Sequence, residues 1–344
     1  MAKILSAVAV ALVVVLVLVL TFHFGSVGEP LKIAYSDWPG WVAWEVAVQQ
    51  GWFAEAGVDV EFVWFEYGPS MDAFAAGRVD AVSMTNGDAM VLGAAGKKSM
   101  AVVINDFSNG NDMVIARPGI ESIRDLEGKR VGVELNLVDH LLLLKALEVN
   151  GMSEQDVVLI NMPTNDTPQA LAAGGVDAIA AWNPIAAQTL DQVAGSKPLF
   201  TSREAPGLIY DALYVDRTSL ANRRGDWLKV AAVWFRCVQF INDPATQPEA
   251  LAIMSARVGT TPERYQKFLA GTQLLGLSEN LAAYREGEGL NSIVGSSRIV
   301  NRFNLENQVY NESQEVRSYF DSSLIEALHE GQAEDGSGRK VATL

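Results

Sequence analysis

The sequence is short of cysteine, histidine and positive charge, and each shortage excludes a class of function. The single cysteine, Cys237, rules out an intramolecular disulfide and a cysteine-pair metal site, and its apolar neighbours predict a small buried side chain. The 26 Lys and Arg face 41 Asp and Glu, which gives a net charge of −15. Phosphate backbones repel such a protein, so we expect no nucleic-acid partner.

Motifs of catalysis are also missing. The chain has no HExxH or GxSxG sequence, and "GAAGKKS" at 93–99 fails the spacing of a phosphate-binding loop. Of the three histidines, only His140 lies well inside the chain, beside Asp139. No nucleophile or metal ligand set converges on this pair. We therefore predict a protein that is not an enzyme and has no catalytic residues, cofactor or metal.

What the sequence does contain is a long apolar run at its start. Lys3 precedes an almost unbroken apolar segment from Ile4 to Leu20. A positive start followed by an apolar core predicts export across a membrane, and hence a periplasmic protein. Counted through Phe24, the run approaches the ~20 residues that span a bilayer. Residues 1–28 are therefore predicted to be an export signal or a membrane anchor, and both alternatives stay open.

After residue 30, strand-like runs alternate with amphipathic helical segments. This alternation predicts an α/β fold with mostly parallel sheets, and the pattern becomes helical from about Asp226. One segment has an echo: "AFAAGRVDAV" at 73–82 recurs as "ALAAGGVDAI" at 170–179. The repeat predicts two similar lobes, for which 344 residues are sufficient.

Four further segments occur in an order that resembles the periplasmic solute-binding proteins of ABC importers. They are "GWFAEAGVDVEFVWF" (51–65), "MDAFAAGRVDAVSMTNGDAM" (71–90), "IESIRDLEGKRVGVE" (120–134) and "AGGVDAIAAWNP" (173–184). The group resembled includes binders of nitrate, taurine, aliphatic sulfonates and thiamine precursors. Within it, "YSDWPGW" and "NDFSNGNDM" look most like the branch associated with urea carboxylase, which implies a urea-like or guanidine-like ligand.

This resemblance implies a type II periplasmic binding protein with two α/β lobes. Lobe 1 would comprise residues 29–111 and 208–328, lobe 2 residues 112–207, and a disordered tail residues 329–344. The protein would be a monomeric receptor that binds a small molecule between the lobes and delivers it to an ABC membrane permease. Two crossovers, near 105–112 and 206–211, predict hinge closure.

In such folds the ligand lies between the lobes at the ends of strands. The side chains expected there are mostly acids and tryptophans, namely Asp37, Trp38, Glu66, Asn86, Asp106, Glu134, Asp139, Trp182 and Asp211. Carboxylates accept paired N–H bonds from a guanidinium, and indole faces attract cations. A cleft lined by acids therefore favours a small, planar, nitrogen-rich ligand.

Alternatives remain for the ligand and for single residues. An anion of the sulfonate or nitrate type, or a thiamine precursor, is the main alternative ligand, although "ELNLVDH" at 134–140 lacks the Ser and Thr that suit an anion. A membrane-tethered sensor lobe is an alternative function. Some residues have structural roles open to them: Asp88 and Asp166 as N-caps, Asp139 as a first-turn acid, Asp106 and Asp211 at the hinge, and Trp41, Trp44 and Trp182 in the core.

Overall fold

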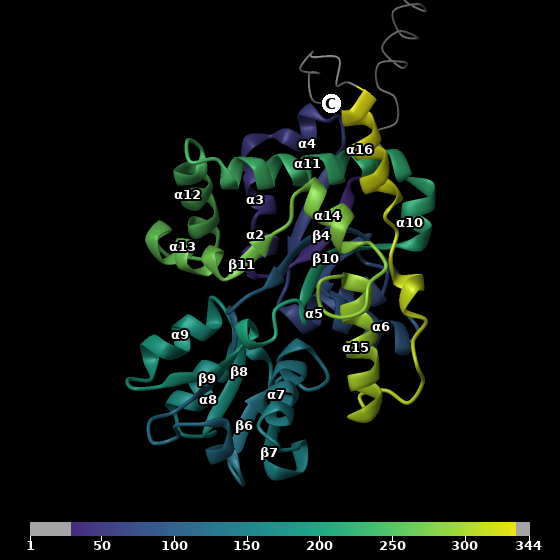
Figure 1. Ribbon diagram of the computed structural model, residues 1–344. Helices are drawn as coiled ribbons and strands as arrows, with labels where there is room; N and C mark the ends of the chain where they lie inside the picture. The colour runs from purple at the N-terminus through teal and green to yellow at the C-terminus, as the bar shows by residue number, and fades with distance from the viewer. Residues whose placement is uncertain (1–28, 335–344) are drawn as a thin grey trace, which may run out of the picture.

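Residues 29–334 are described by the computed structural model, and they form two α/β lobes, each built on its own sheet (Figure 1). The predicted export segment, residues 1–28, lies outside the described residues, as do residues 335–344 of the predicted tail. The tail prediction begins too early, because helix α16 runs from Ser323 to Glu334. Within residues 29–334, no helix combines the length and the apolar character needed to cross a membrane.

The first lobe is built on a six-stranded sheet in the order β11–β4–β10–β3–β1–β2. Its strands are β1 (Leu31–Tyr35), β2 (Val60–Trp64), β3 (Ala81–Thr85), β4 (Ser99–Ser108), β10 (Tyr210–Asp216) and β11 (Thr272–Leu274). Strand β1 pairs in parallel with β2 and β3, whereas β10 runs antiparallel to both β3 and β4. The antiparallel strand β10 is the one that brings the chain back from the second lobe.

The second lobe is built on a five-stranded sheet in the order β7–β6–β8–β5–β9. Its strands are β5 (Asp112–Ala116), β6 (Arg130–Val133), β7 (Val158–Asn161), β8 (Ala178–Trp182) and β9 (Lys197–Thr201). The chain passes between the sheets at 109–111 and again at 202–209. The two crossovers touch, because the backbone N–H of Gly110 donates to the hydroxyl of Ser202 at 2.7 Å.

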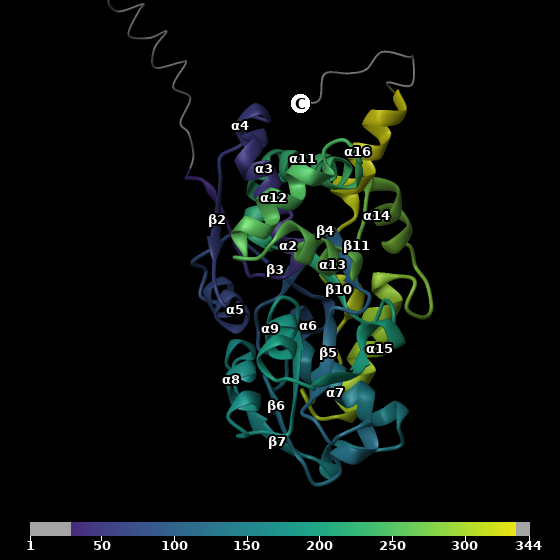
Figure 2. The ribbon, with the colours of Figure 1, turned by 90° about the vertical axis from the view of Figure 1, so that its left-hand side faces the viewer.

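Helices cover both sheets and dominate the last third of the chain, as predicted (Figure 2). The first lobe begins with α2 (Pro39–Val42), α3 (Trp44–Gln50), α4 (Trp52–Glu55), α5 (Tyr67–Ala75) and α6 (Asn86–Ala94). The second lobe has α7 (Val138–Val149), α8 (Thr167–Ala172) and α9 (Ile185–Gln192). The last third adds α10 (Arg217–Asn222), α11 (Arg224–Asn242), α12 (Gln247–Arg257), α13 (Pro262–Ala270), α14 (Leu277–Ala283), α15 (Ile293–Glu306) and α16.

The internal echo corresponds to one structural unit that is used in each lobe. In the first lobe α5 leads into β3, and in the second α8 leads into β8. The turn after each helix contains a glycine with a left-handed backbone, Gly77 at φ 69° and Gly174 at φ 71°. Side chains other than glycine rarely adopt this conformation, so both copies need glycine to end the helix and enter the strand.

The aspartate of each echo also has the same role in its lobe. Asp80 accepts a hydrogen bond from the backbone N–H of Lys32 at 2.9 Å, and Asp177 accepts one from that of Arg130 at 3.0 Å. Lys32 and Arg130 lie in β1 and β6, the parallel neighbours of β3 and β8. Each aspartate therefore fixes a neighbouring strand, and the two lobes share this device.

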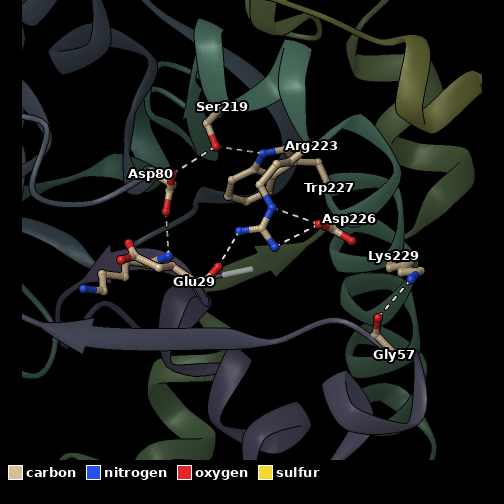
Figure 3. A network of polar contacts seen from close by, with 9 residues as sticks. Glu29, Gly57, Asp80, Ser219, Arg223, Asp226, Trp227 and Lys229 are labelled. Atoms are coloured by element: carbon tan, nitrogen blue, oxygen red, sulfur yellow. Dashed lines mark hydrogen bonds and ion pairs between the residues drawn. The ribbon is translucent and has the colours of Figure 1, made fainter. Parts of the chain in front are cut away.

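A polar network holds the start of the described chain against the first lobe (Figure 3). Arg223 donates to the backbone carbonyl of Glu29 at 2.7 Å and pairs with Asp226 at 2.9 Å. The hydroxyl of Ser219 donates to Asp80 at 3.1 Å, on the same side of β1. The chain therefore enters the sheet clamped by α10 and α11.

The core of the first lobe is rich in aromatic side chains. Trp44 is fully buried, and its ring centroid lies 4.7 Å from that of Trp234 on α11. Cys237 is buried as a free thiol on the same helix. The predictions that Trp44 packs in the core and that Cys237 is a small buried side chain are confirmed.

Candidate ligand-binding site

A small cavity lies between the lobes where strands of both sheets end. We call it the inner cavity, and it is lined by Trp38, Trp41, Tyr67, Thr85, Asp112, Val138, Trp182, Ile209 and Asp211. Its volume is about 10 Å³, near the lower limit for a single water molecule. Since its walls come from both lobes, separation of the lobes would enlarge it.

Four aromatic rings frame the inner cavity. Trp41 stacks on Tyr67 with centroids 5.3 Å apart, and Trp38 packs against Trp41 at 6.3 Å. Tyr67 in turn meets the edge of Trp182, on the opposite lobe, at 5.3 Å. All four are buried, so Trp41 belongs both to the packed interior, as predicted, and to the cavity wall. The rings offer faces on which a planar ligand could stack.

Two of the predicted acids, Asp106 and Asp211, lie directly opposite each other where β4 pairs with β10. The indole Nε1 of Trp38 donates to Oδ1 of Asp106 at 3.0 Å. Among the described residues no backbone or basic group reaches Oδ2 of either carboxyl, so the two turn to each other. Burial raises the pKa of Asp106 to about 8 and that of Asp211 well above its ordinary value. Two buried negative charges this close repel each other, so one proton between the two carboxyls would relieve the repulsion.

A third acid, Asp112, lies in the cavity wall and was not predicted. It starts β5 opposite Trp182 of β8, and it is only 2% exposed. Its Oδ2 has no hydrogen-bond partner among the described residues. Burial raises the pKa of Asp112 to about 7, against the opposing effect of a hydrogen bond from Ser108. The available sequence signal was its place between the first crossover and an apolar strand.

Asp88 joins the two lobes rather than capping its own helix. Thr85 caps α6, because its hydroxyl accepts the backbone N–H of Asp88 at 3.1 Å, so the N-cap interpretation of Asp88 was wrong. The Asp88 carboxyl accepts the hydroxyl of Tyr67 at 2.5 Å. Burial raises its pKa to about 7, against hydrogen bonds that include the backbone N–H of Val138, the first residue of α7. The Asp88 carboxyl of lobe 1 thus lies near the N-terminus of helix α7 in lobe 2.

Glu134 and Asp139 share one donor. The Thr164 hydroxyl lies 2.9 Å from Oε2 of Glu134 and 2.6 Å from Oδ2 of Asp139. A hydroxyl has one hydrogen to donate, so it cannot satisfy two charged carboxylates at once. Burial raises the pKa of both acids, and most strongly that of Asp139, which is fully buried. Asp139 is therefore enclosed behind Thr164, whereas Glu134 lines the open part of the cleft.

Two further cavities continue the cleft outward. One, of about 60 Å³, is lined by Glu66, Tyr67, Pro69, Glu134, Pro163, Thr164, Asn165 and Trp182. The second, of about 430 Å³, contains Asp88 and Glu134 in its walls, and we call it the outer groove. At the rim, the Asn165 amide of lobe 2 donates to Glu66 of lobe 1 at 3.2 Å. Glu66 thus lies at the entrance rather than in the interior.

Four predicted site residues lie outside these cavity walls, namely Asp106 and Asp139, described above, and Asn86 and Asp37. The amide nitrogen of Asn86 donates to the hydroxyls of Ser296 and Ser297, and its oxygen accepts the backbone N–H of Tyr210, so Asn86 joins α6 to α15 and β10. Asp37 is half-buried and accepts the indole N–H of Trp64 at 2.7 Å. Burial raises the pKa of Asp37, and its carboxyl binds Trp64 at the rim of the first lobe rather than facing the cavity.

The chemistry of the site is that of acceptors and aromatic faces. None of the side chains that line the inner cavity or the outer groove is Lys or Arg. Within residues 29–334, no three His, Cys, Asp or Glu side chains are placed to hold a metal ion. His140 faces Glu154, 3.6 Å away, and its Nδ1 accepts the backbone N–H of Asn136. The arrangement can bind a cation or a hydrogen-bond donor, because no basic group offsets its carboxyls.

Curated relatives of the chain are named as binding proteins. A candidate binding protein of Brucella abortus (strain 2308) is 29% identical over 203 residues, which cover 58% of this chain and 63% of that protein. A candidate aliphatic sulfonates-binding protein of Bacillus subtilis (strain 168) is 27% identical over 203 residues, which cover 55% of this chain and 60% of that protein. The chain thus spans less than two-thirds of the length of these relatives.

The fold is that of known periplasmic receptors. The alkanesulfonate-binding protein of Xanthomonas axonopodis pv. citri, solved with MOPS bound, superposes with a TM-score of 0.70 at 17% identity, over 86% of this chain and 99% of that one. The predicted two-lobed type II periplasmic binding protein fold is thereby confirmed. The sequence profile of the NMT1-like family matches residues 27–255, which is more than half of the 344 residues. The chain therefore belongs to the NMT1-like family.

Proposed function

We propose that the protein is the extracytoplasmic solute receptor of an ABC importer, which binds a small ligand between its lobes and delivers it to a membrane permease. Three observations support this: the family, the two-lobed fold, and a cavity whose walls come from both lobes. The relatives described above are binding proteins, not enzymes. The hinge would lie in the crossovers at 109–111 and 202–209, because they are the only backbone links between the sheets in the described chain.

For the ligand, we propose a planar nitrogen-rich solute, and a guanidinium-type cation first. The observation that carries this is a group of buried carboxyls that have no basic partner among the described residues. Asp112 and Asp211 line the inner cavity, Asp106 lies opposite Asp211, and Asp88 lies in the wall of the outer groove. A buried carboxylate without a counter-charge costs several kcal/mol, so each of these groups takes a proton or a cation. A guanidinium supplies both the positive charge and paired N–H donors in a plane that fits between tryptophan rings.

A sulfonate or nitrate is the second candidate, and the names of the relatives favour it over urea or guanidine. The side chains of this chain argue the other way. Anion sites use free backbone N–H groups at helix starts, or Arg. Here the carboxyl of Asp88 lies near the start of α7, where it would repel an anion, and no Arg lines the inner cavity. A thiamine precursor would also need acceptors and rings, and it belongs in the same test.

Isothermal calorimetry with guanidinium, methylguanidine, urea, taurine, nitrate and a thiamine-type pyrimidine at pH 8 tests the proposal. We expect binding of guanidinium or methylguanidine, and loss of that binding in the double variant Asp106→Asn/Asp211→Asn. Binding of taurine or nitrate alone would establish the receptor function and reject the cation. Binding of none of the six would contradict the ligand class altogether.

A further inference from the structure

We propose that the ligand carries an apolar substituent and that this substituent occupies the outer groove. The proposal rests on the receptor function above and names a narrower class of ligand: a cation, such as a guanidinium or an amine, bearing an alkyl or aryl group. The first argument is volume. The inner cavity measures about 10 Å³ and the outer groove about 430 Å³, and the latter lies within the ~300–1,000 Å³ of small-molecule sites.

The second argument is the chemistry of the groove wall. Apolar side chains come from both lobes, with Met71, Val91 and Leu92 on one side and Leu135, Leu137 and Met162 on the other. All but Met71 retain some exposure, so they present apolar surface to the groove. The charged groups in the wall are carboxyls, Asp72, Asp88 and Glu134. An apolar wall with only negative charge is complementary to an apolar group that carries a cationic end.

The third argument is continuity between the groove and the inner cavity. The 60 Å³ cavity shares Tyr67 and Trp182 with the inner cavity, and it shares Glu134 with the groove. Tyr67 and Trp182 belong to opposite lobes and meet edge to face. The two rings thus stand in the wall that the inner cavity and the 60 Å³ cavity share, and separation of the lobes would part them. A ligand whose head lies beside Asp211 would pass between the rings and emerge at Glu134.

The backbone of Gly68 lies close to Glu134, at the junction of the 60 Å³ cavity and the outer groove. A Cβ atom on Gly68 would lie 2.7 Å from Oε1 of Glu134 and 4.0 Å from Cδ1 of Leu137. Any larger residue there would therefore press on the Glu134 carboxyl at the junction of the two cavities. With glycine, α5 of lobe 1 lies close to Glu134 of lobe 2 while the groove beyond it stays open.

Calorimetry with a homologous series tests this inference: guanidinium, then ethyl-, butyl- and hexylguanidinium, at pH 8. We expect affinity to rise about threefold to fourfold for each CH₂ that enters the groove, as for buried methylene groups in general. Met162→Ala should reduce the gain per CH₂ while leaving guanidinium itself unchanged. Met152→Ala is the matched control, a partly buried methionine of the same lobe outside the groove wall, and it should leave the series unchanged.

The outcomes separate the two proposals. If guanidinium binds but longer chains bind no better, the substituent pocket is wrong and the cation receptor stands. If the affinity rises equally along the series in the wild type, in Met162→Ala and in the groove-filling variant Leu92→Trp, the alkyl group of the ligand does not lie in the groove. If no member of the series binds, the cation site and the groove proposal both fail.

Discussion

Aspartates on the outer faces of the lobes and aspartates in the cleft show one residue type in two electrostatic settings. Asp177 pairs with Arg117 at 2.8 Å and with Arg130 at 3.3 Å. Burial acts to raise its pKa, but hydrogen bonds from Arg130 and the charge of Arg117 outweigh it, so the pKa of Asp177 is lowered. Asp211 lies deeper in the molecule, within β10, and has no basic neighbour among the described residues. Burial, and then the charge of Asp106, raise the pKa of Asp211.

The contrast shows where the chain uses its few basic residues. Lys97 pairs with Asp216 and Arg257 with Glu45, both on the first lobe and both away from the inner cavity. Asp177, Asp216 and Glu45 thus have positive partners at fixed positions. The cleft acids have none among the described residues, so a proton or a ligand must supply the balancing charge. Four predictions test this distinction.

The largest effect is expected from Asp211→Asn. This change removes the charge of the Asp106–Asp211 pair and should weaken guanidinium binding at least about 30-fold, since truncating one member of a buried charge pair costs ~2 kcal/mol or more. Asp177→Asn makes the same chemical change in the paired setting. It should lower the free energy of unfolding of the second lobe yet leave affinity within about twofold. Equal losses of affinity in the two variants, measured by calorimetry, would contradict the distinction.

The second effect is on pH dependence. The folded-state pKa values of Asp112, about 7, and Asp106, about 8, exceed the ~3.9 of an unfolded aspartate. Between these pH values the folded state binds more protons than the unfolded state does. The contribution of these two groups to the stability of the ligand-free protein should therefore be fully present below pH ~4. It should be lost as the pH rises toward 8. Urea unfolding at pH 5, 6.5 and 8 measures this.

Cation binding should show the opposite trend. A cation replaces the protons, so affinity should rise about tenfold per pH unit for each proton displaced as the pH increases from 6 to 8. The variant Asp106→Asn/Asp211→Asn should reduce the pH dependence of stability and leave the part that Asp112 contributes. A flat calorimetric affinity across this range in the wild type would show that the cleft carboxyls are already charged.

A smaller effect is expected from Trp38→Phe. The change keeps an aromatic ring but removes the N–H that donates to Asp106, which should weaken cation binding about fivefold, or ~1 kcal/mol. Trp64→Phe is the control, because its indole donates to Asp37 at the exposed rim. If both variants bind as the wild type does, the Trp38 hydrogen bond does not orient the pair.

The smallest effect is expected at the surface of the cleft. Arg264 on α13 of lobe 1 forms an ion pair with Asp191 on α9 of lobe 2. Exposed pairs contribute ~0–1 kcal/mol, so Arg264→Gln should speed ligand dissociation by up to about fivefold with little change in association. Stopped-flow fluorescence of the cleft tryptophans measures both rates. Asp191→Asn should act alike, and the double variant should be no worse than either single one.

Much of the fold followed from local sequence patterns. The regular alternation of β6, β8 and α7 and the echo of glycine and aspartate were sufficient to predict two α/β lobes. Strand β9 was missed because "KPLFT" is short and contains proline, and pairing with β5 is what makes it a strand. The helical segment that follows β1 is likewise divided, into α2 and α3, which no local pattern indicates.

The site was harder to predict because neighbouring residues at a strand end point in different directions. Thr85 lines the inner cavity whereas Asn86, the next residue, turns to α15. Trp38 faces the cavity and Asp37 faces Trp64, for the same reason. Asp88 acts on the other lobe, and no local pattern contains that contact. Residue type identified the acids and tryptophans, and only the three-dimensional arrangement separated the cleft from the rim.

The network around Arg223 also bears on which lobe stays free to move when the protein is immobilised by one end. Glu29 is bound to α11, and the final helix α16 packs on that same helix, so both ends of the described chain are attached to one lobe (Figure 1). A pull on either end would load only the first lobe. The second lobe, joined through two short crossovers, would carry no tension and could swing freely. Immobilising the protein by either end should therefore leave its ligand kinetics intact.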